Sequence, residues 1–125
     1  MNQLVIESWL LLLYFEVVMR FRSFRELHEI VREEKVRKAN GSMPSSTAEL
    51  CHALDLACVF YFKKVMCLQR SAATTLLLRR HGQDAEMVIG AQMLPFKSHA
   101  WVEVRGAIVN DRPYMLDIYC VLERC

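Results

Sequence analysis

The first half of the chain carries apolar residues at helical spacing. Residues 4–19 are dense in Leu, Val, Ile and aromatic side chains and lack Gly and Pro, which predicts a mostly buried helix. A second helix is predicted to begin at Ser23, where "SFRE" has the form of a capping box. Ser46 and Glu49 repeat that pattern and predict a third helix. The segment 40–46, "NGSMPSS", is rich in turn-forming residues and is predicted to be the loop between these two helices.

A fourth helix is predicted over residues 67–81, after which the pattern changes period. Apolar positions recur there at i, i+4, i+7 and i+8, and Gly82 supplies a C-terminal stop. The alternation typical of strands follows, with a two-residue turn at 105–106. The predicted strands are 85–91, 99–104, 107–110 and 114–123. Helices followed by antiparallel strands predict an α+β fold.

The length of the chain allows one hydrophobic core. With 125 residues, it is expected to form a single domain, 1–125, made of a helical N-terminal part, 1–45, and a catalytic core, 46–125. The 16 basic and 14 acidic residues give a net charge of +2, which does not indicate nucleic-acid binding. The apolar run at 8–15 ends after eight residues, whereas a membrane-spanning helix needs about 20, so no transmembrane segment is expected.

The cysteines indicate a reducing compartment. The chain has five, an odd number without C-x-x-C pairs, and no secretory signal pattern, so a cytoplasmic location with free thiols is expected. Four of them, Cys51, Cys58, Cys120 and Cys125, are interpreted as small apolar residues. A zinc site built from Cys51, Cys58, Cys67 and His52 is disfavoured because paired short spacings are missing.

Cys67, His99 and Asp111 follow one another in an order that predicts nucleophilic catalysis. Cys67 begins the fourth helix, where unpaired amides and the helix dipole stabilise a thiolate and an oxyanion. With the turn at 105–106, residues whose numbers sum to about 211 pair across the hairpin, which brings Asp111 beside His99. A thiol, an imidazole base and a carboxylate that orients the imidazole form a catalytic triad.

Three segments resemble the leader peptidases of lasso-peptide biosynthesis, a transglutaminase-like branch of the papain-type cysteine proteases. They are "CLQRSAATTLLLRRHG", "AEMVIG" and "PFKSHAWVEVRGAIVND", and the resemblance spans roughly residues 46–115. It implies a papain-like core with Cys67 as nucleophile, His99 as base and Asp111 as orienting acid. It also implies cleavage of a ribosomally made precursor peptide between leader and core, through an acyl-enzyme and without metal or organic cofactor.

The chain resembles the split form of this family, because it has no room for a fused leader-recognition domain. The implied partners are the precursor peptide and a separate leader-recognition protein, known as a RiPP recognition element. The ATP-using cyclase is a further candidate partner, and the implied setting is a bacterial cytoplasm. Two rival functions stay open: a transglutaminase-like acyltransferase with an amine acceptor, and a non-catalytic binding module of the same fold.

Four further residues near the triad are expected to support it. Trp101 is expected to form a wall of the site or to pack in the core. Gln69 and a backbone amide are the alternatives for a second oxyanion donor. Arg70 is expected to bridge to a carboxylate such as Glu103, in a structural role.

Overall fold

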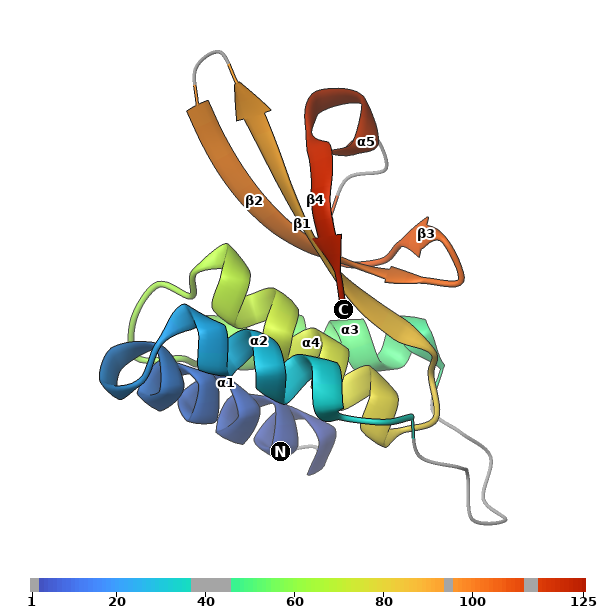
Figure 1. The fold of residues 1–125 in the computed structure, drawn as a ribbon. Coiled ribbons are helices and arrows are strands. Elements are labelled where there is room, and N and C mark those ends of the chain that lie inside the picture. The colour runs from blue at the N-terminus through green and yellow to red at the C-terminus, as the bar shows by residue number, and fades with distance from the viewer. Residues whose placement is uncertain (1–2, 37–45, 94–95, 112–114) are drawn as a thin grey trace.

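The computed structural model describes residues 3–36, 46–93, 96–111 and 115–125, and these form five helices and a four-stranded sheet. The helices are α1 (Gln3–Phe21), α2 (Phe24–Glu33), α3 (Thr47–Val59), α4 (Cys67–Arg80) and α5 (Met115–Ile118). The strands are β1 (Ala85–Met93), β2 (Phe96–Val104), β3 (Ala107–Ile108) and β4 (Cys120–Arg124). Figure 1 shows α1 to α4 gathered on one side of the sheet, with α5 at its far end. The predicted α+β class is confirmed.

Ser23 and Ser46 are the N-cap residues of α2 and α3, as predicted. The Ser23 hydroxyl accepts a hydrogen bond from the Glu26 amide at 3.3 Å, and α2 begins at the next residue. The Ser46 hydroxyl accepts from the Glu49 amide at 3.1 Å and caps α3. Nearly all of the predicted loop, residues 40–46, lies outside the described residues.

Helix α4 lies at the centre of the molecule. Ten of its 14 residues are buried, because it packs against α1 on one side and against β1 and β2 on the other. The side-chain amide of Gln69 donates to the Leu12 carbonyl at 2.8 Å, and the Arg79 guanidinium donates to the Ala85 carbonyl at 2.8 Å. These bonds tie α4 to both neighbouring layers.

The hairpin of β2 and β3 has the predicted register. Glu103 pairs with Ile108 and Val104 with Ala107, so paired numbers sum to 211. The two turn residues, Arg105 and Gly106, have φ angles of 52° and 82°. Two positive φ angles are what a type I′ turn requires, and its twist matches that of the flanking strands.

The predicted strand at 114–123 is wrong in its first half. Residues 115–118 form the short helix α5, and the strand β4 covers only Cys120–Arg124. The Tyr119 amide donates to the Met115 carbonyl at 2.9 Å, which closes a helical turn. That turn is favoured because it buries Met115 against Val88 and Trp101 on the sheet face that points away from α4.

Gly90 allows this second, smaller apolar cluster to form. A Cβ at position 90 would lie 2.7 Å from the Trp101 ring and 2.9 Å from the Tyr119 Cβ, closer than real carbon contacts. Only a glycine therefore lets Trp101 lie flat across β1.

Replacing Gly90 by Ala is expected to lower the free energy of unfolding by about 1–3 kcal/mol, because the added methyl group overpacks the cluster. Urea denaturation of the wild type and of Gly90→Ala measures the change. Trp101→Phe shortens the clashing ring, so Gly90→Ala should cost less in that background. Equal costs in both backgrounds would contradict the assignment of the strain to Trp101.

Candidate active site

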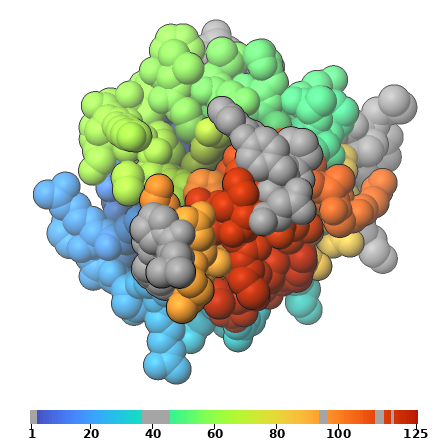
Figure 2. All heavy atoms as spheres, turned by 90° about the horizontal axis from the view of Figure 1, so that it is seen from above, coloured from blue at the N-terminus to red at the C-terminus, as the bar shows by residue number. Residues whose placement is uncertain are grey.

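A pocket of about 340 Å³ lies where the N-terminal end of α4 meets β2 and the residues after β3. It brings together all three residues of the predicted triad. Its lining consists of Lys64, Val65, Met66, Cys67, Arg70, Ser71, His99, Ala100, Asn110 and Asp111. In Figure 2 the middle of the chain, coloured green, borders the C-terminal part, coloured orange and red.

Cys67 is the first residue of α4 and is half-buried at the pocket. The N-cap residue, Met66, has an extended backbone and makes no side-chain capping hydrogen bond. The first amides of α4 therefore have no side-chain acceptor from their cap and remain available to an anion at the pocket. This is the arrangement that a thiolate and an oxyanion need.

His99 lies on β2, beyond the two residue pairs that β2 makes with β3. Its Nε2 is hydrogen-bonded to Oδ2 of Asp111, so the structure has the cross-hairpin contact that the turn predicted. Because the bond engages Nε2, Nδ1 is the other ring nitrogen of a side chain that lines the same pocket as Cys67. A carboxylate bonded in this way fixes the tautomer and the orientation of an imidazole base.

Two aromatic rings hold the imidazole in place. The His99 ring stacks with Tyr119 at 5.5 Å between centroids and with Trp101 at 6.3 Å. Trp101 is fully buried, and its indole N–H donates to Glu103 at 3.0 Å. Trp101 therefore backs the imidazole from the core and does not line the pocket. Tyr119 was not predicted, because its segment was assigned to a regular strand.

Arg70 does not make the expected bridge to Glu103. Its guanidinium pairs with Asp55 of α3, and it lines the pocket beside Cys67. Glu103 lies on the sheet face that points away from α4, where its partners are Trp101 and Arg124, the latter at 2.6 Å. The two residues belong to different layers, so the expected bridge from Arg70 to a carboxylate forms with Asp55 and not with Glu103.

Gln69 lies in the core between α4 and α1. Its side chain is 1% exposed, and its amide donates to the Leu12 carbonyl at 2.8 Å and to the Tyr61 hydroxyl at 3.4 Å. It is not among the residues that line the pocket, so its position does not support the expected role as an oxyanion donor. A backbone amide at the start of α4 is the remaining alternative.

Asn110 also lines the pocket and was not predicted. Its carbonyl oxygen accepts from the Val102 amide at 2.7 Å, and its amide donates to the Ser71 hydroxyl at 3.3 Å. The sequence held one signal for it, its position directly before Asp111.

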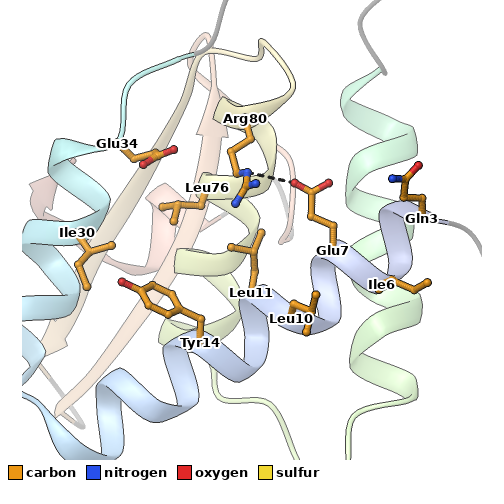
Figure 3. A pocket seen from close by; sticks show the side chains of 10 residues that line it. All are labelled: Gln3, Ile6, Glu7, Leu10, Leu11, Tyr14, Ile30, Glu34, Leu76 and Arg80. Carbon is orange, nitrogen blue, oxygen red and sulfur yellow. Dashed lines mark ion pairs between the residues drawn. The ribbon is translucent and has the colours of Figure 1, made fainter.

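A larger hollow of about 700 Å³ lies between α1, α2 and α4, away from the triad (Figure 3). Its lining is mostly apolar, and its polar side chains include an ion pair between Glu7 and Arg80 at 3.2 Å. No Cys or His is among the described residues that line it, so it offers neither a thiol nor an imidazole base. Within the described part of the chain, no cluster of His, Cys, Asp and Glu suits a metal ion, and no helix could cross a membrane.

Comparison with known proteins places the chain in a family. The Microcin J25-processing protein McjB of Escherichia coli is 40% identical over 70 residues, which are 54% of this chain and 34% of that protein. The match thus spans about a third of the length of this relative. No solved structure matches the chain. A family model described as the transglutaminase-like superfamily matches residues 11–124, nearly the whole sequence, and the chain therefore belongs to the transglutaminase-like superfamily.

Proposed function

We propose that this protein is a cysteine peptidase that removes the leader from a ribosomally made lasso-peptide precursor. The observation that carries the proposal is the pocket, where Cys67 at a helix start meets an imidazole bonded to a carboxylate. The similarity to a protein named for processing microcin J25 supports peptide processing as the reaction. We assign Cys67 as nucleophile, His99 as general acid and base, and Asp111 as the residue that orients His99.

The reaction starts with transfer of the Cys67 proton to Nδ1 of His99. The thiolate then attacks the carbonyl carbon of the scissile bond, and the resulting oxyanion accepts hydrogen bonds from amides at the start of α4. The C–N bond breaks as the imidazolium gives its proton to the departing amine of the core peptide. Water, deprotonated by His99, hydrolyses the thioester and releases the leader with a free carboxylate.

Recognition of the leader is proposed to come from a second protein. A pocket of about 340 Å³ is near the lower end of the range for ligand sites and holds only a short stretch of peptide. A separate leader-recognition protein, the RiPP recognition element, is therefore the proposed partner in a bacterial cytoplasm. The freed amine of the core is the group that an ATP-using cyclase would join to an acidic side chain, which makes the cyclase a candidate partner too.

The other cysteines are poor competitors as nucleophiles. Burial raises the pKa of Cys51 to about 11 and also raises the pKa values of Cys58 and Cys125. These three are therefore mostly thiols near neutral pH and should react slowly with alkylating agents. Cys120 is exposed on β4 and does not line the pocket of Cys67, so it serves as an internal reference for a surface thiol.

Cleavage is tested by mass spectrometry of a lasso-peptide precursor incubated with this protein and its recognition partner. A single cut between leader and core is expected, and Cys67→Ala should abolish it while Cys120→Ala keeps it. Asp111→Asn should slow cleavage by about 10³- to 10⁴-fold, because the imidazole loses the carboxylate that fixes its tautomer. An adduct of the leader with an added amine would favour the acyltransferase, and an intact precursor with both proteins present would contradict the peptidase.

Alkylation by iodoacetamide at neutral pH should modify Cys67 faster than Cys120, because His99 assists loss of the Cys67 proton. Cys51, Cys58 and Cys125 should react more slowly than Cys120, because burial raises their pKa values. Peptide mapping by mass spectrometry gives each rate, and His99→Ala should slow Cys67 without changing Cys120. Equal rates for Cys67 in the wild type and in His99→Ala would argue against the assigned nucleophile and base.

A further inference from the structure

Asn110 connects the helix that carries the nucleophile to the strand that carries the base. Its carbonyl oxygen accepts from the backbone amide of Val102 on β2 at 2.7 Å, and its amide donates to the hydroxyl of Ser71 on α4 at 3.3 Å. Ser71 is 1% exposed and lies one helical turn after Cys67. One side chain therefore spans both halves of the pocket.

The first of these bonds also ends the pairing of the hairpin. The Val109 amide donates to the Val102 carbonyl at 3.0 Å, as in a regular antiparallel ladder. In such a ladder the Val102 amide would donate back to the carbonyl of Val109. The Asn110 side chain accepts it instead, and at the next residue Asp111 reaches His99.

We propose that Asn110 is a positioning residue for the triad, an inference that rests on the proposed peptidase function. Asn110 holds α4 and β2 at a fixed separation, so that Cys67 and His99 face the same pocket. It also fixes the point from which Asp111 is presented to His99. Asn110 thus fixes the separation of α4 and β2, and Asp111 orients the imidazole of His99.

Four variants test this role. Asn110→Leu keeps the size of the side chain and removes both hydrogen bonds, and Ser71→Ala removes only the bond to α4. Asn110→Asp keeps an acceptor for the Val102 amide and for the Ser71 hydroxyl, so it should retain more activity than the Leu variant. Ser8→Ala is the matched control, since Ser8 is also a fully buried helical serine, bonded to the Leu4 carbonyl at 2.7 Å.

Precursor cleavage is measured for the folded variants, with thermal melting as the check on folding. Asn110→Leu should lower kcat by about 10- to 100-fold with little change in KM. This is the loss expected when reacting groups are displaced by up to about 1 Å. Ser71→Ala should lower kcat by less, and the double variant should be no slower than Asn110→Leu, because both changes break one connection. Ser8→Ala should leave kcat unchanged.

Nitrogen-15 NMR of labelled histidines reads the same geometry without a substrate. The NMR signal of the hydrogen-bonded ring N–H of His99 should lose intensity or shift in Asn110→Leu. The signal of His81, which pairs with Glu7 at 2.9 Å, should not change. Unchanged kcat and an unchanged His99 signal would overturn the positioning role. A wild type that leaves the precursor intact would instead refute the peptidase, and the NMR comparison would still decide the role of Asn110. If Asn110→Leu does not fold, Ser71→Ala provides the same two measurements.

Discussion

The structure depends on burying α4, a helix that is surrounded by protein and yet carries polar side chains. A buried polar group without a partner costs free energy, and the five buried polar residues of α4 all have one inside the fold. Thr74 and Thr75 donate to carbonyls one turn back within the helix. Gln69 bonds to α1, and the Arg79 guanidinium reaches carbonyls of β1 and of the α2 region. These bonds are directional, so they fix the rotation of α4 about its axis and its position along that axis. Apolar packing alone would allow the helix to shift along its axis.

A helix fixed in this way determines where Cys67 lies, because Cys67 is its first residue. The opposite wall of the pocket is set by β2, whose pairing with β3 covers only two residue pairs. Beyond them Val109 and Asn110 still bond Val102 on β2, and at the next residue Asp111 bonds His99. Tyr119 and Trp101 close the other side of the imidazole. The pocket thus forms where the helical layer meets the sheet, and each layer contributes one residue of the proposed nucleophile and base.

Local patterns in the sequence predicted the parts of this arrangement that depend on near neighbours. The capping serines, the start of α4 at Cys67 and the hairpin register follow from residues within a few positions, and the register was enough to bring Asp111 to His99. Contacts between layers were not predictable in the same way. The partner of Arg70 depends on how α3 lies against α4, and Glu103 lies on the far face of the sheet.

The prediction of a strand over residues 114–123 failed for a different physical reason. Its alternating apolar residues fit a strand, but Met115 and Tyr119 are also one helical turn apart, and the sequence does not say which spacing the packing will use. The cluster with Trp101 decides it, and that cluster requires the pairing of β1 with β2, which places Val88 beside Trp101. Asn110 was missed for a similar reason, since its two partners lie on a strand and a helix that meet only in the folded chain.

The choice between hydrolysis and transfer to an amine rests on what reaches the acyl-enzyme, because the triad serves both reactions. The His99 and Asp111 side chains retain 26% and 23% of their exposure, so bulk water has access to the imidazole that must activate it. Transfer to an amine requires that a bound acceptor exclude this water before the thioester hydrolyses. The pocket of about 340 Å³ is lined on its helical side by Lys64, whose positive charge disfavours binding of a protonated amine, and by Arg70, which is already paired with Asp55. The exposure of the imidazole and the charge of Lys64 both favour water as the acceptor in the proposed reaction.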